Sequence, residues 1–138
     1  MKKNLLIIVL VSMFSCKQKI TNADISNLNG YWEIEKVELP DGDKKEYKVN
    51  ETIDFFKIDS NKGFRKKVMP QLDGTYLTND IQENVVVVVK DGDASLQYKT
   101  KYASWKEEII ELTKDKLVVK NQQEIEYYYK RPAKFSVK

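Results

Sequence analysis

The sequence predicts an all-β protein built on a single antiparallel sheet that closes into a barrel. Eight or nine short strands rich in β-branched and aromatic residues recur along the chain, with turn residues roughly every 8–12 positions. No segment shows a convincing helical period, and 138 residues suffice for one domain with a modest core. Closure into a barrel would remove the strand edges that an open sheet exposes, and a two-sheet sandwich is the alternative.

The amino terminus has the layout of a secretory signal peptide. Lys2 and Lys3 precede an apolar run over residues 5–11 that is too short for a permanent membrane helix. Cys16 is the only cysteine, so no intramolecular disulfide can form. The junction resembles a bacterial lipoprotein cleavage site. The resemblance implies removal of residues 1–15, diacylglycerol on the Cys16 sulfur and an acyl group such as palmitate on the new amino terminus. A buried free thiol and an ordinary secretory signal are the alternatives.

Residues 16–27 are expected to form the lipidated cysteine and a flexible tether, because they are polar with only isolated apolar side chains. Neither an aspartate directly after Cys16 nor an acidic run follows the cysteine. By analogy with other lipoproteins, this predicts an outer-membrane location with the protein held by its lipid. The periplasmic face is favoured, and surface exposure stays open.

The charge balance argues against nucleic acid as a partner. The chain has 24 basic and 21 acidic residues, and loss of Lys2 and Lys3 leaves 22 against 21. Binding to nucleic acid needs a concentrated surplus of basic side chains. The local basic patch Arg65-Lys66-Lys67 could contact nucleic acid or anionic headgroups, but a solvated edge strand protected by lysines is the favoured interpretation.

The first strand is expected over residues 31–39. Trp32 and Ile34 lie on one face and Val37 and Leu39 on the other, so the apolar phase switches near Glu35-Lys36, as a β-bulge or a sharp coil of the strand would produce. Five consecutive valines over 85–89 predict a strand buried on both faces. The remaining strands are expected over 52–58, 64–69, 75–78, 96–102, 107–113, 117–120 and 125–131.

Gly30-Tyr31-Trp32 at the start of the first strand, together with Arg131 in the last, resembles the lipocalin-like, or calycin, barrels. In that family the glycine allows a tight chain entry, the tryptophan plugs the closed end and an arginine of the last strand packs across it. The resemblance implies a domain over residues 28–132, with Trp32 and Arg131 as the barrel-closing pair and 133–138 as a tail. It is to the short lipocalin-like domains of bacterial lipoproteins.

Residue types argue against catalysis. Histidine is absent and the single thiol is expected to carry lipid, which removes the usual Cys–His and Ser–His–Asp sites and the commonest transition-metal sites. Asp41-Gly42-Asp43 and Asp91-Gly92-Asp93 are too short for calcium loops and are expected to be turns. We therefore expect no enzyme activity, no metal and no cofactor.

The predicted function depends on whether the barrel has a cavity. The residues expected to line one are Phe55, Leu96, Tyr98, Tyr102, Tyr127 and Tyr129. An eight-stranded barrel can hold one small ligand or be filled by its side chains, and these bulky residues permit either. The first hypothesis is binding of a small apolar or amphipathic ligand, with the loop 41–51 near the mouth. The second is an accessory subunit that docks on an outer-membrane or secretion complex.

Overall fold

The structure, a computed structural model, describes residues 17–133. The predicted signal segment, the lipidation site Cys16 and residues 134–138 lie outside this range. Among the described residues, no helix combines the length and apolar character that crossing a bilayer requires. The elements are the 3-10 helix η1 (Asn22–Leu28) and the strands β1 (Gly30–Glu38), β2 (Lys44–Glu46), β3 (Ile53–Asp59), β4 (Lys62–Pro70), β5 (Tyr76–Leu77), β6 (Glu83–Lys90), β7 (Asp93–Lys99), β8 (Ser104–Leu112), β9 (Lys116–Asn121) and β10 (Glu126–Lys130).

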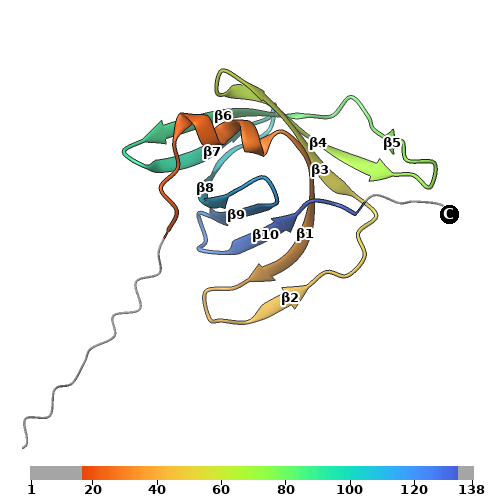
Figure 1. The fold of residues 1–138 in the computed structure, drawn as a ribbon, viewed down its shortest axis with the longest axis horizontal. Coiled ribbons are helices and arrows are strands. Elements are labelled where there is room, and N and C mark those ends of the chain that lie inside the picture. Colours follow the sequence, from red (N-terminus) through yellow and green to blue (C-terminus); the bar gives the residue numbers. More distant parts are fainter. Residues whose placement is uncertain (1–16, 134–138) are drawn as a thin grey trace, which may run out of the picture.

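Eight of these strands form a closed antiparallel barrel (Figure 1), which confirms the predicted fold class. The strands follow the order β1-β3-β4-β6-β7-β8-β9-β10, and pairing of β10 with β1 closes the ring. The short strands β2 and β5 stand outside it. β2 pairs with the end of β1, and β5 pairs with the end of β4.

The barrel interior is filled at one end by apolar side chains. Trp32, Phe56, Leu96 and Ile109, among others, are almost completely inaccessible to solvent. The predicted bulge in the first strand is confirmed: the register between β1 and β10 shifts between Ile34 and Lys36. Because a bulge adds one residue to one strand, it changes which face of the sheet the following side chains point to.

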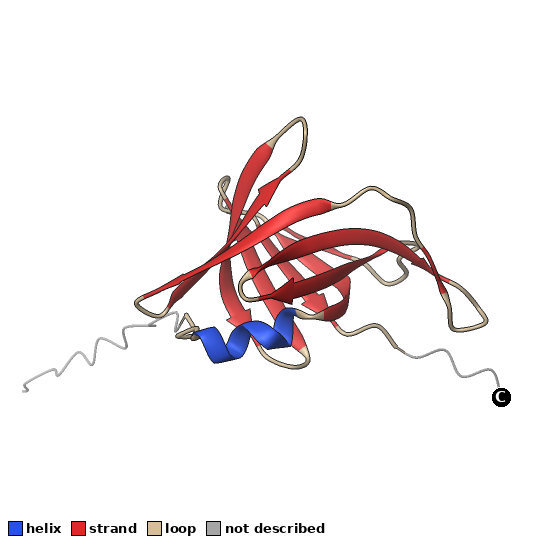
Figure 2. Cartoon of the chain, turned by 90° about the horizontal axis from the view of Figure 1, so that it is seen from above, coloured by secondary structure: helices blue, strands red, loops and turns tan. Residues whose placement is uncertain are grey.

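The segment before the first strand closes this end of the barrel, and the prediction of a flexible tether over residues 17–27 is wrong. Figure 2 shows η1 lying against the ends of the barrel strands. Ile20, Ile25 and Leu28 are buried in the core, and the Ile20 N–H donates to the carbonyl of Gly92 at 2.9 Å. The isolated apolar residues of this polar stretch are therefore the contacts that hold it on the barrel.

Gln18 ties the same segment to β8, which gives a first prediction. Its side-chain amide donates to the Leu112 carbonyl at 3.0 Å and its carbonyl accepts from the Leu112 N–H at 2.8 Å. Replacing Gln18 with alanine should lower the free energy of unfolding by about 1–2 kcal/mol, because two partly buried backbone groups lose their partners. Urea denaturation would measure this, with the exposed Gln97→Ala as control. Equal stability of the two variants would contradict the packed segment.

The outer face of the barrel is partly covered as well. Tyr31, Phe55 and Phe64 form a chain of aromatic contacts, and Tyr76 of β5 stacks on Tyr31 with ring centroids 4.0 Å apart.

The outer face of β6 is exposed to solvent, and the prediction that strand 85–89 is buried on both faces is wrong. Val85 and Val87 point into the core, whereas Val86 and Val88 are 39% and 40% exposed. Valine favours the strand backbone at both kinds of position.

Candidate functional site

The closed end of the barrel joins Trp32 to Arg131. The guanidinium carbon lies 3.6 Å from the Trp32 ring centroid. Arg131 also donates hydrogen bonds to the carbonyls of Asn27, Tyr31 and Lys114 at 2.7–2.9 Å. Gly30 has a φ of +106°, which favours glycine, and an added Cβ would approach Arg131 Nη1 to 3.2 Å. Glycine therefore allows both this backbone conformation and the close approach of the arginine. The closed end of the barrel is therefore filled by side chains, and these residues stabilise the fold.

The opposite end is hollow. Two hollows of about 350 and 490 Å³ share Lys67, Tyr127 and Tyr129 in their walls and therefore adjoin. Trp105 and Glu107 line the first, while Ile34 and Asp54 line the second. The second is also bordered by residues of the predicted mouth loop, namely Tyr47, Val49, Asn50 and Glu51.

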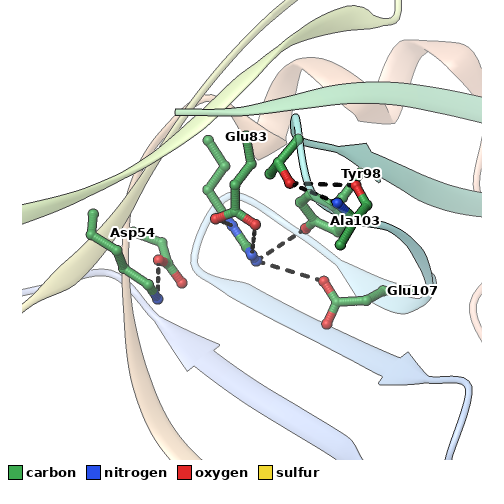
Figure 3. A network of polar contacts seen from close by, with 8 residues as sticks. Asp54, Glu83, Tyr98, Ala103 and Glu107 are labelled. Carbon is green, nitrogen blue, oxygen red and sulfur yellow. Dashed lines mark hydrogen bonds and ion pairs between the residues drawn. The ribbon is translucent and has the colours of Figure 1, made fainter. Parts of the chain in front are cut away.

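A network of polar contacts includes Asp54, Glu83, Tyr98 and Glu107 (Figure 3). Arg65 is at its centre, because it contacts Glu83, Tyr98 and Glu107. Arg65 donates to both carboxylate oxygens of Glu83, at 3.1 and 2.7 Å, and to the Tyr98 hydroxyl at 3.3 Å. Its guanidinium carbon is 4.3 Å from the Tyr98 ring centroid. Only 12% of the Arg65 side chain is exposed. A bidentate arginine–carboxylate pair of this kind has fixed geometry as well as strength.

The network includes two further carboxylates, Asp54 and Glu107, which are both buried. Asp54 forms an ion pair with Lys67, with 2.5 Å between Nζ and Oδ1. Glu107 Oε1 lies 3.7 Å from Arg65 Nη1, which is too long for a hydrogen bond. Within the described chain, that oxygen has no hydrogen-bond partner although it is buried. These carboxylates do not belong to any group of three metal-ligating side chains among residues 17–133.

Burial sets the protonation behaviour of this region. Desolvation raises the pKa of Glu107, the charges of Asp54 and Glu83 add to that rise, and Arg65 and the Tyr98 hydroxyl oppose it. Desolvation likewise raises the pKa of the Tyr98 and Tyr129 phenols, so both rings stay neutral near pH 7. The open end thus offers aromatic surface, hydroxyl groups and a carboxylate whose charge is costly to maintain.

The structure brings some of the predicted cavity residues together. Tyr127 and Tyr129 line the hollows, whereas Leu96 and Tyr98 are buried beneath them. Two predictions are wrong. Phe55 faces outward into the aromatic contacts with Tyr31, because Phe56 takes the inward position of that pair. Tyr102 is 89% exposed, because β7 ends at Lys99 and the chain turns before reaching it.

The polar residues of the site escaped the sequence analysis. Arg65 and Lys67 were expected on a solvated edge strand. β4 pairs with β3 over both residues and with β6 as far as Arg65, so Arg65 lies inside the sheet, whereas Lys67 lies just beyond the β6 ladder and its side chain is 60% exposed. Period-two alternation does carry a signal for Glu107, which shares a strand face with Trp105 and Ile109.

A larger hollow, which we call the outer groove, lies outside the barrel. It measures about 650 Å³ and opens between the β4–β5 extension and the last strand. Its walls include Val49, Pro70, Tyr76 and Pro132. The nearby side chains of Leu72 and Leu77 are 80% and 58% exposed, so this side of the molecule presents apolar surface to solvent.

Comparison with known proteins identifies the fold. The model of the lipocalin-like domain family matches residues 28–119. A lipocalin-like protein from Bacteroides uniformis ATCC 8492 aligns with a TM-score of 0.50 and 13% identity, over 77% of this chain and 99% of that one. An uncharacterized protein from Bacteroides eggerthii DSM 20697 aligns with a TM-score of 0.50 and 15% identity, over 76% and 99% of the two chains. No curated protein matches the sequence. Because the family model covers about two thirds of the residues, the chain belongs to the lipocalin-like domain family.

Proposed function

We propose that this protein binds a small amphipathic molecule, without catalysis, in the open end of its barrel. The observation that carries the proposal is the pair of adjoining hollows, about 350 and 490 Å³, at the end opposite η1. Small-molecule sites typically measure about 300–1,000 Å³ and combine apolar walls with a few placed polar groups. The buried charges favour an amphipathic ligand over a purely apolar one, because an apolar molecule would cover polar groups without replacing their contacts with water.

We also propose that the protein is held on the outer membrane by lipid on Cys16. The sequence around Ser15 and Cys16 supports this anchor. Lys17, the next residue, forms ion pairs with Asp93 and Glu108 on the barrel. A lipid on Cys16 would therefore hold the barrel close to the bilayer, without a long tether. Because this attachment is near the closed end, the ligand-binding mouth would open away from the bilayer.

The fluorescent probe N-phenyl-1-naphthylamine, a neutral aromatic molecule that carries one N–H group, tests the binding site. Replacing Tyr127 with alanine should weaken probe binding by about tenfold or more, because aromatic anchors in a pocket typically contribute more than about 1 kcal/mol. Fluorescence titration measures the affinity. Tyr128→Ala is the matched control, since Tyr128 lies on the other face of β10, where its hydroxyl donates a hydrogen bond to the Glu126 carboxylate.

Two results would overturn the proposed site. Failure of the wild-type protein to bind the probe would argue against a ligand-binding barrel. Binding that is unaffected by Tyr127→Ala but lost in Tyr76→Ala would place the ligand in the outer groove instead. In either case, native mass spectrometry of the protein extracted from its membranes would show whether a natural ligand adds mass beyond the acyl chains.

A second candidate function is that of an accessory subunit on an outer-membrane protein complex. It is favoured by the exposed apolar side chains of Leu72, Leu77 and Ile81, which lie close together in the sequence before, in and after β5. Exposed apolar surface that is grouped in this way often marks a protein contact. Co-migration with a large outer-membrane protein that is lost in Leu77→Asp and retained in Tyr127→Ala would support this function over ligand binding.

A further inference from the structure

We infer that the ligand of the barrel mouth carries a protonated amine, which donates hydrogen bonds to the Glu107 carboxylate while its apolar body lies against Trp105, Tyr127 and Tyr129. This inference rests on the proposed ligand-binding function and specifies the class of ligand. It follows from which charges of the network are closely paired and which one has only a long ion pair and no hydrogen bond to its Oε1.

The two cations of the network, the buried Arg65 and the more exposed Lys67, are already engaged. Arg65 commits Nε and Nη2 to Glu83 and directs Nη1 at the Tyr98 hydroxyl. Lys67 is paired with Asp54. Lys106 borders the hollow, but its strand neighbours Trp105 and Glu107 take the inward positions, so its side chain belongs to the outer face. An anionic ligand would have to compete with Glu83 or Asp54 for these cations.

Glu107 is the carboxylate that lacks both a close cation and a hydrogen-bond donor to its Oε1. The network contains three carboxylates, Asp54, Glu83 and Glu107, against the two cations Arg65 and Lys67. Only 9% of the Glu107 side chain is exposed, and its oxygen Oε1 has no hydrogen-bond partner within the described residues. The same is true of the buried Asp54 Oδ1, but that oxygen lies 2.5 Å from Lys67 Nζ, whereas Glu107 Oε1 is 3.7 Å from Arg65 Nη1. A buried carboxylate in this state is unfavourable unless a donor reaches it or it takes up a proton.

The surroundings of Glu107 suit an organic cation. The carboxylate lines the hollow together with the rings of Trp105, Tyr127 and Tyr129. Aromatic faces attract a desolvated cation and also pack well against an apolar body. An ammonium group would supply both the missing positive charge and the N–H donors. A hydroxyl would supply one donor only, and a carboxylate would add to the negative charge.

Three ligands that share a phenylethyl body test the inference: 2-phenylethylamine, 2-phenylethanol and 3-phenylpropanoate. Isothermal titration calorimetry with the full mature protein should show the amine binding at least about tenfold more tightly than the alcohol, with the carboxylate weakest. Glu107→Gln should reduce amine affinity to that of the alcohol and leave alcohol affinity unchanged. Glu108→Gln is the control, because Glu108 is the next residue of β8 and faces outward to Lys17.

The outcomes separate this inference from the function on which it rests. If neither N-phenyl-1-naphthylamine nor any member of the series binds, the binding function itself fails. If the probe binds but amine and alcohol bind equally, or Glu107→Gln leaves amine affinity intact, only the ligand class is wrong. Tightest binding by 3-phenylpropanoate would reverse the charge preference and overturn the inference. Retained probe binding by Glu107→Gln confirms that the variant is folded.

Discussion

Replacing Trp32 with alanine is expected to reduce the free energy of unfolding by about 3–5 kcal/mol, the usual range for a fully buried tryptophan. The side chain is inaccessible to solvent, its Nε1–H donates to the Leu28 carbonyl at 2.8 Å and Arg131 covers its face. The substitution removes the contact between β1, η1 and the last strand in one step. For a domain of this size, the melting temperature should fall by roughly 10–20 °C.

Urea denaturation followed by far-UV circular dichroism measures this loss, since the second tryptophan complicates a fluorescence signal. Arg131→Lys, which keeps the charge but not the planar fork, should cost less than Trp32→Ala. The double variant Trp32→Phe/Arg131→Lys should be more stable than the sum of its single variants predicts, because the two side chains share one contact. A loss below about 1 kcal/mol in Trp32→Ala would show that the closed end tolerates a cavity. Strict additivity in the double variant would show that the two side chains do not stabilise each other.

The sequence was sufficient to predict the closed barrel. Alternation in 96–102 and turn residues at regular spacing are local signals, and they led to the correct class because each strand of a barrel repeats the same pattern. The phase change near Glu35 likewise predicted a bulge that the structure contains. Such features depend on nearest neighbours along the chain, so they can be recognised without knowing which strands pair.

The errors arise where a distant element changes what a strand face contacts. Phe55 and Phe64 lie on the outside because β5 and Tyr76 cover that part of the sheet, so apolar character did not indicate the inward face. Ile20, Ile25 and Leu28 are too widely spaced to indicate a helical face, yet they bury against strands far along the chain. Neither covering segment can be inferred from periodicity.

The candidate site was hidden for a related reason. A basic run such as Arg65-Lys66-Lys67 is usually solvated, and only the pairing of β4 with β6 brings Arg65 to Glu83. The partners Asp54, Glu83 and Glu107 come from three different strands. A polar network inside a core is specified by tertiary contacts, and functional sites are where local rules are expected to fail.

Replacing Arg65 with alanine is expected to destabilise the protein by about 3–5 kcal/mol, because it leaves buried carboxylates without their cation. Glu83 loses a bidentate partner, Glu107 loses its ion pair and Tyr98 loses a donor. Combining Arg65→Met with Glu83→Gln and Glu107→Gln should recover most of the loss, since an apolar or neutral replacement of a buried charge network is often tolerated. A loss below about 1 kcal/mol in Arg65→Ala would mean that water reaches the network.

The pH dependence of stability distinguishes the role of Glu107 from that of Arg65. Burial raises the pKa of Glu107 in the folded state, so its contribution to stability is fully present below its ordinary pKa and is lost as the pH rises through the raised value. Glu107→Gln should therefore be more stable than the wild type near pH 7 and equal to it near pH 4. Arg65→Ala should be most destabilised near pH 7. Its stability should approach that of the wild type at low pH, where the buried carboxylates left without Arg65 take up protons.

Thermal denaturation at several pH values between about 4 and 8 measures both effects, and Glu108→Gln is the control for a carboxylate on the outer face. A stabilising Glu107→Gln substitution that also weakens amine binding would show that the carboxylate is kept at a cost to the fold, as binding groups often are. If Glu107→Gln instead destabilises the protein at every pH, Glu107 is a structural partner of Arg65, and its carboxylate is not available to a ligand.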